Sequence, residues 1–136
     1  MERLEWSSRL EIGNSIIDLQ HQKFVSIINK LQDAFFSAED VNIEEIQKTV
    51  FKELLEYTRY HFASEEKLMQ ECKYPESSNH WRLHKDFDRT VYEKFRALQQ
   101  GECILTSDLL MLIQTWLVNH ILTEDQKFGK YLRDCQ

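Results

Sequence analysis

The segment HFASEEKLM, residues 61–69, places a histidine four positions before a carboxylate. Side chains four apart lie on one face of an α-helix, so His61 and Glu65 point the same way and Glu66 turns aside. An imidazole and a carboxylate on a shared face can form a surface ion pair, or they can supply two ligands to a metal ion. The other histidines of the chain bear on this choice.

Four long helices are expected to carry these histidines. Apolar residues recur at spacings of three and four, with capping residues near the ends of each run. The predicted helices run from about Asp18, the expected N-cap, to Ala38, from Asn42 to about Cys72, from Ser77 or Ser78 to before Gly101, and from Thr106 or Ser107 to about Glu124. A short tail helix follows, separated by Gly129, and residues 1–16 form an irregular arm anchored by Trp6. Short connections favour antiparallel neighbours, so we predict an all-α, antiparallel up-down-up-down four-helix bundle, a single domain over residues 1–136.

All five histidines of the sequence fall at one level of this bundle. At about 1.5 Å per residue, they and Asp125 lie roughly 20 to 31 Å from the end that holds the first and third turns. One histidine in an apolar stripe is usually a core residue with a hydrogen bond, but five in one layer would need five partners. Buried anionic Glu65 and Asp125 would also need a compensating cation. A metal centre meets both needs, with candidate ligands His21, His61, Glu65, His80, His84, His120 and Asp125.

The number and type of these ligands bear on the metal. Five nitrogen and two oxygen donors are too many for one tetrahedral zinc ion and too rich in nitrogen for magnesium or calcium. Two octahedral first-row metals bridged by the carboxylates fit the number. The sequence contains no HExxH or CxxC zinc pattern and no paired Glu-x-x-His motif of the ferritin-like di-iron proteins.

The motifs that hold these residues resemble those of the single-domain bacterial hemerythrins. They are IDLQH ending at His21, HFASEEKLM with His61 and Glu65, YPESSNHWRLHKDF with His80 and His84, and WLVNHILTED with His120 and Asp125. The resemblance covers nearly the whole chain, includes Trp6 and Gly13, and uses every histidine.

This resemblance implies a non-haem centre of two iron ions, Fe2+ or Fe3+, bridged by Glu65, Asp125 and a solvent-derived oxo or hydroxo group. One iron would be coordinatively complete, and the other would keep an open position where dioxygen binds. The complete iron would take His80, His84 and His120, and the open iron would take His21 and His61. No catalytic residue is implied.

Apolar residues beside the ligands match positions that line the oxygen pocket of that family. They are Phe24, Phe62, Trp116, Leu117 and Ile121. The same residues would belong to the core of any bundle. Phe24 stands where the family pattern has an aliphatic residue, and we expect it to narrow access or to alter the rate of oxidation. Gln20 is expected to orient a ligand histidine.

The composition argues against several other classes of protein. The formal net charge of -6 argues against nucleic acid or anionic lipid as a partner. The first ten residues, MERLEWSSRL, do not predict a secretory signal, and no apolar run approaches membrane-spanning length. The three cysteines lack CxxC spacing, which suits reduced thiols. We therefore expect a cytoplasmic protein without a nucleic-acid or membrane partner.

The function expected from these features is reversible dioxygen binding for transport, storage or delivery, rather than enzymatic catalysis. Ligation rich in imidazole, with no extra acid beside the open position, favours binding of O2 over cleavage of its O–O bond. A di-iron peroxidase or oxidase, a nitric oxide scavenger and an oxygen- or redox-sensing module remain alternatives. The sequence does not indicate which redox partner or oxygen-consuming enzyme such a protein would serve.

Overall fold

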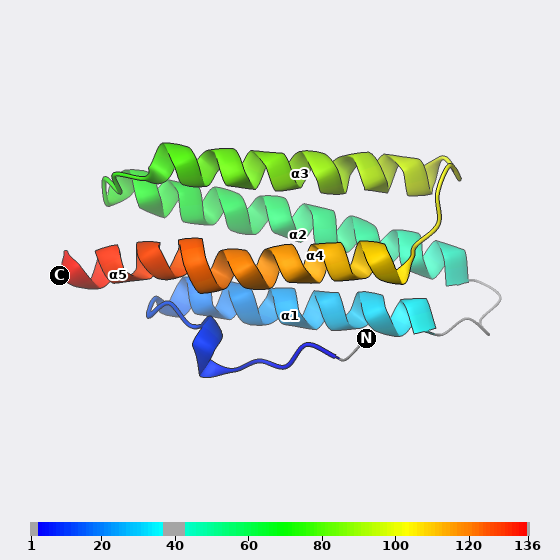
Figure 1. The fold of residues 1–136 in the computed structure, drawn as a ribbon, viewed down its shortest axis with the longest axis horizontal. Coiled ribbons are helices and arrows are strands. Elements are labelled where there is room, and N and C mark those ends of the chain that lie inside the picture. Colours follow the sequence, from blue (N-terminus) through cyan, green and yellow to red (C-terminus); the bar gives the residue numbers. More distant parts are fainter. Residues whose placement is uncertain (1–2, 37–42, 136) are drawn as a thin grey trace.

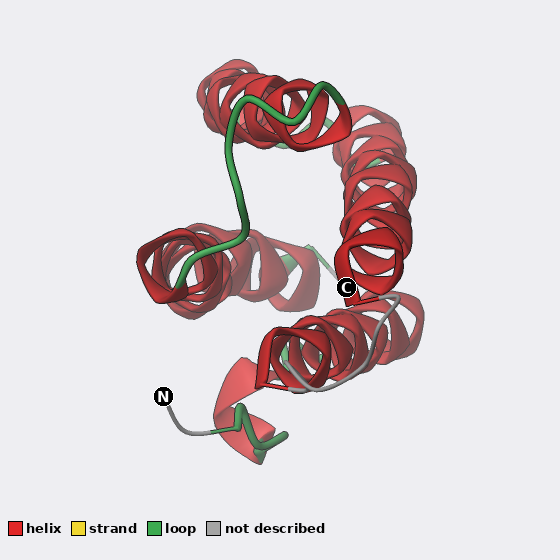
Figure 2. Cartoon of the chain, turned by 90° about the vertical axis from the view of Figure 1, so that its right-hand side faces the viewer, coloured by secondary structure: helices red, strands yellow, loops and turns green. Residues whose placement is uncertain are grey.

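The structure is a computed structural model that describes residues 3–36 and 43–135. Its long helices run side by side in alternating directions, and seen from one end they are arranged around a common axis (Figures 1 and 2). The elements are a 3-10 turn η1 (Ser8–Leu10), α1 (Ser15–Phe36), α2 (Ile43–Glu71), α3 (Ser77–Gln99), α4 (Ser107–His120), a π-helical turn η2 (Ile121–Asp125) and α5 (Gln126–Asp134). The predicted four-helix bundle is confirmed, and the described residues contain no strand. None of the described helices is long and apolar enough to cross a membrane.

The first helix begins earlier than its sequence pattern suggests. It starts at Ser15, and the side-chain oxygen of Asn14 accepts hydrogen bonds from two backbone N–H groups of the first turn, both at 3.1 Å. The prediction that Asp18 caps this helix was therefore wrong. The Asp18 carboxylate instead accepts hydrogen bonds from the backbone N–H groups of Ile12, at 2.7 Å, and Gly13. The predicted boundaries at Ala38 and Asn42 lie outside the described residues.

The N-terminal arm is held against α1 at several points. Leu10 and Ile12 are 5% and 1% exposed, whereas Trp6, the predicted anchor, is only half-buried. The buried side chain of Asn29 accepts a hydrogen bond from the backbone N–H of Leu4 and donates one to its carbonyl oxygen, at 2.8 and 2.7 Å. The arm therefore has a fixed path, which brings its backbone close to the histidine layer.

A polar layer interrupts the apolar core. A large cluster that includes Phe24, Leu54 and Leu117 fills one part of the bundle. A smaller cluster fills the end where α5 lies, and its buried members are Ile12, Ile17, Met69, Tyr74 and Phe128. The buried residues between these clusters along the helices include all five histidines, Glu65 and Asp125. Apolar clusters flank this buried layer, so its charges must be compensated within the protein or by a bound ion.

Gly129 lies inside α5, which corrects the prediction that it separates a tail helix. A Cβ atom at this position would clash with the backbone carbonyl oxygen of Ile12 and would lie 2.8 Å from the Ile12 Cβ. The glycine thus permits the close approach of α5 to the arm and does not end a helix.

A Gly129→Ala variant tests this contact. We expect a net loss of about 1 to 3 kcal/mol in the free energy of unfolding, even though alanine is the better helix former, because the arm backbone must move. Urea unfolding of the metal-free protein measures the loss. Lys130→Ala, at the exposed neighbouring position, is the matched control and should change stability by less than about 0.5 kcal/mol. Equal stability of the two variants would show that the arm does not need the glycine.

Candidate metal centre

The structure brings together all seven residues that the sequence suggests as metal ligands. Their ligand atoms form two overlapping groups, and the atoms within each group lie within 4.8 Å of one another. One group is Glu65, His80, His84, His120 and Asp125, and the other is His21, His61, Glu65 and Asp125. Four helices and the π-helical turn contribute to the cluster, and every member is buried.

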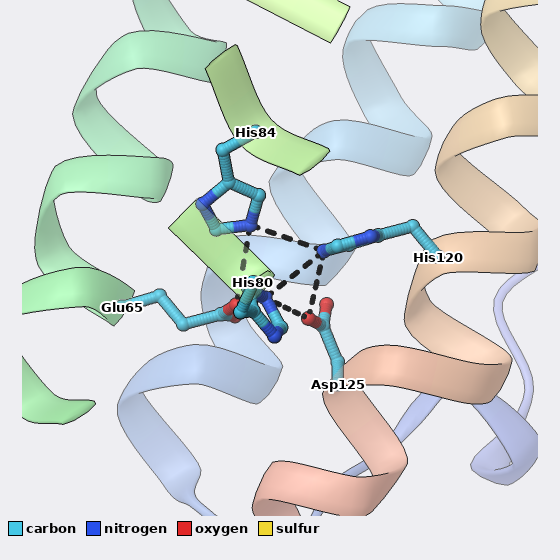
Figure 3. Close-up of side chains that lie close together, drawn as sticks. All are labelled: Glu65, His80, His84, His120 and Asp125. Carbon is cyan, nitrogen blue, oxygen red and sulfur yellow. Dashed lines mark hydrogen bonds and ion pairs between the residues drawn. The ribbon is translucent and has the colours of Figure 1, made fainter. Parts of the chain in front are cut away.

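In the larger group, three imidazoles converge on one point, as Figure 3 shows. His120 Nε2 lies 3.0 Å from the Nε2 atoms of both His80 and His84. Ligands about 2.1 Å from a metal ion and at right angles to each other are about 3.0 Å apart, so the spacing fits adjacent positions around one ion. The three nitrogens therefore have the geometry of a shared ligand set.

The two carboxylates belong to both groups, because each carboxylate presents one oxygen to each group. Glu65 Oε1 lies 2.6 Å from His80 Nε2, and Oε2 lies 3.4 Å from His61 Nε2. Asp125 Oδ1 lies 3.1 Å from His80 Nε2, and Oδ2 lies 3.1 Å from His21 Nε2. This is the arrangement of two carboxylates that bridge a pair of ions.

Several of these atoms lack a hydrogen bond of good geometry. Both oxygens of Glu65, both oxygens of Asp125 and His21 Nε2 are buried without one, although imidazole nitrogens lie nearby. Four unsatisfied carboxylate oxygens in a dry core are costly unless a cation binds them. The residues present therefore fit a pair of metal ions.

Protons take the place of metal in the metal-free site. Burial alone raises the pKa of the Glu65 and Asp125 carboxyls, but the surrounding histidines lower both pKa values below their ordinary range. Burial lowers the pKa of His80, but the close negative charges of Asp125 and Glu65, with which it forms ion pairs, outweigh burial and raise the pKa to about 9. Burial dominates at His61, and its pKa is lowered. Metal binding must displace these protons, so it competes with acid.

The π-helical turn η2 brings Asp125 to the site. Asp125 comes five positions after His120, and in an α-helix, at about 100° per residue, the two side chains would lie roughly 140° apart around the axis. The wider π turn, with its i→i+5 hydrogen bonds, changes this angle. Asp125 Oδ1 lies 3.1 Å from His120 Nε2 as a result.

Hydrogen bonds on the far side of two histidine rings, those of His21 and His61, fix their orientation. His21 Nδ1 lies 3.2 Å from the carbonyl oxygen of Leu10, and His61 Nδ1 lies 2.6 Å from Gln20 Oε1, the contact expected for Gln20. An oxygen of this kind only accepts, so Nδ1 carries the proton and Nε2 is free to bind metal. The Leu10 contact could not be predicted from the sequence, because it depends on the path of the arm.

The proposed pocket residues lie around the cluster, but on different sides of it. Phe24 packs edge-on against His61, with ring centroids 5.0 Å apart. Phe62 stacks on His84 at 3.7 Å, and Trp116 stacks on His120 at 4.6 Å. The remaining two, Leu117 and Ile121, are 1% and 4% exposed. Phe62 and Trp116 therefore lie closest to the group that contains His80, His84 and His120, the three-histidine group. Phe24 lies against the group that contains His21 and His61, the two-histidine group.

Comparisons with known proteins agree with this arrangement. The model of the hemerythrin HHE cation binding domain matches residues 12–132. A bacteriohemerythrin of Pseudomonas aeruginosa is 39% identical over 133 residues, which are 98% of this chain and 84% of that protein, and one of Stenotrophomonas maltophilia is 35% identical with the same coverage. The crystal structure of a wild-type hemerythrin, 26% identical, superposes with a TM-score of 0.86 over 95% of this chain and 97% of that chain. The chain therefore belongs to the hemerythrin family, and its resemblance to the bacterial members is confirmed.

Proposed function

We propose that the seven clustered residues hold two iron ions and that the protein binds dioxygen reversibly, for transport, storage or delivery. His80, His84 and His120 would hold one iron, and His21 and His61 the other. Glu65, Asp125 and an oxo or hydroxo group would bridge them. Membership of the hemerythrin family supports an oxygen-binding protein with non-haem iron.

The unequal size of the two ligand groups carries this proposal. One group contains five residues and the other four, and both include the two shared carboxylates. With one further bridging ligand, five donors complete an octahedron and four leave a position free. The free position would lie on the side of His21 and His61. When bound to the seven residues, the two irons would supply the electrons that reduce dioxygen as it binds.

An apolar side chain of the chain lies on this side of the cluster. Phe24 packs against the His61 ring and is 1% exposed, and Leu117 and Ile121 of the proposed pocket are buried as well. An apolar wall admits neutral O2 and hinders the escape of charged reduced oxygen species, which slows irreversible oxidation of the site. Gln20 and the Leu10 carbonyl hold the two histidine rings in place through their Nδ1 atoms.

Iron analysis and absorbance spectra on one sample test the proposal. We expect two irons per chain, in line with the two ligand groups, and a visible charge-transfer band that appears when O2 is added to the reduced protein and disappears when O2 is removed. A zinc-loaded sample is the control, because it fills the same ligands but should give no such band. Irreversible oxidation on the first exposure to O2, or steady turnover of peroxide with a reductant, would favour an enzyme or a redox sensor. A chain that binds no iron would contradict the proposal altogether.

A further inference from the structure

The Nδ1 atoms of the ligand histidines face away from the cluster, and the groups that accept their hydrogen bonds differ in charge. His84 Nδ1 lies 2.8 Å from the Glu66 carboxylate, at Oε2. The corresponding partner of His61 is a neutral amide, Gln20, and that of His21 is a backbone carbonyl. Among the described residues, Glu66 provides the one carboxylate at the Nδ1 atom of a ligand histidine, and that histidine, His84, belongs to the three-histidine group.

Glu66 reaches this contact from the surface. It follows Glu65 on α2, so it points away from the bridging carboxylate and crosses to α3. Its side chain is 19% exposed, whereas the His84 side chain is 1% exposed. Glu66 also lines a hollow of about 350 Å³ between the two helices, together with Arg59 and Lys85. Arg59 pairs there with Asp88, at 2.8 Å.

A second contact fixes the His84 ring independently of Glu66. The ring of Phe62 stacks on it with centroids 3.7 Å apart and planes inclined by 2°. The orientation of His84 therefore has a support that remains when the charge of Glu66 is removed. A change of charge at residue 66 can thus be separated from a loss of ring position.

We propose that Glu66 is a positioning residue that makes the two metal positions unequal, so that the three-histidine position is filled first, releases its metal last and is the more easily oxidised. The inference rests on the proposed di-iron centre. A hydrogen bond to an ionised acceptor is roughly twice as strong as one to a neutral acceptor, and it increases the basicity of the nitrogen that faces the metal. A more basic ligand stabilises the higher charge of a ferric ion more than that of a ferrous ion.

The experiment compares Glu66→Gln with the reciprocal Gln20→Glu variant. Glutamine at position 66 can still accept the hydrogen bond from His84, so mainly the charge is lost. We expect one of the two irons to pass to a chelator about 10- to 100-fold faster than in the wild type, with the other unchanged. A tenfold larger loss of ferric than of ferrous affinity would raise the reduction potential of that iron by about 59 mV. Gln20→Glu should slow release from the opposite position.

Glu71→Gln is the matched control, because it removes the same charge from an exposed position of α2. It should leave both release rates and the potential unchanged. If Glu66→Gln also leaves them unchanged, or accelerates both irons equally, the inference is overturned while the di-iron centre stands. If the wild type binds no iron, the proposed function itself fails.

Discussion

An Asp125→Ala variant is expected to lose nearly all of its iron. The side chain is fully buried and belongs to both ligand groups, with imidazole nitrogens of His21, His80 and His120 all 3.1 Å from its oxygens. Its removal takes a ligand and a negative charge from each position at once. Loss of a residue that only hydrogen-bonds a metal ligand typically costs about 10- to 100-fold in metal affinity. Loss of a shared ligand should therefore cost more than about 100-fold at each position. Metal analysis after dialysis against a weak chelator measures the remaining iron.

The control for this variant is Glu124→Ala, one position earlier. Glu124 is only half-buried, and its ion pair with Lys127, at 3.5 Å, lies at the surface. Iron content should stay at the wild-type value. An Asp125→Ala protein that keeps one tightly bound iron would show that Asp125 serves a single position, and the bridging arrangement would be wrong.

The second large effect is a loss of stability of the metal-free protein as the pH rises. The pKa of His80 is about 9 in the folded protein and about 6.5 when the chain is unfolded. A raised folded pKa contributes stability that is fully present below pH 6.5 and is lost as the pH rises through 9. The difference corresponds to on the order of 3 kcal/mol. Raised pKa values of His21 and His84 act in the same direction, despite the opposing effect of burial.

The acid side has the opposite sign. The lowered pKa values of Glu65 and Asp125 give stability that is present above the ordinary carboxyl pKa of about 4 and is lost as the pH falls below it. The lowered pKa of His61 also disfavours the folded state in acid, because burial opposes its protonation. Together these shifts place the stability maximum of the metal-free protein between about pH 5 and 6.5.

Urea unfolding in the presence of a chelator, from pH 5 to pH 9, measures this profile. A His80→Gln variant should show a flatter profile of stability against pH above pH 6.5, because it lacks the histidine with the largest upward pKa shift. The iron-loaded protein should behave differently, since metal requires neutral imidazoles and gains in apparent affinity as the pH rises. A metal-free protein equally stable at pH 6 and pH 9 would contradict the charged histidine–carboxylate network.

The sequence predicted the fold and the histidine layer because both follow from local periodicity. Apolar spacing sets which face of each helix is buried, and a constant rise per residue sets the level of each histidine. These two facts bring residues from four helices together without any knowledge of loop geometry. Whether the clustered residues hold iron remains a prediction of the resemblance.

The features that the sequence did not reveal depend on contacts between elements. Glu66 turns away from the face of His61, as expected, but its partner His84 lies on another helix. Gly129 resembles a helix break in sequence, yet it serves a contact with Ile12, more than a hundred residues earlier. Asn14 rather than Asp18 caps the first helix. The two residues are similar capping residues, and the hydrogen bonds of Asp18 to the arm decide between them.

The π-helical turn couples the chemistry of the cluster to the length of the polypeptide. Deletion of one residue within Ile121–Asp125 would let the wide turn close to an ordinary α-helical turn, because a π turn holds about one residue more than an α turn. The residues after the turn would then roughly keep their direction, so Phe128 would stay beside Tyr74 and Gly129 would still face the arm. Asp125 would lose the wide turn that brings its carboxylate to His120. A change of one residue in length would therefore act on the carboxylate bridge and spare the packing that closes the end of the bundle.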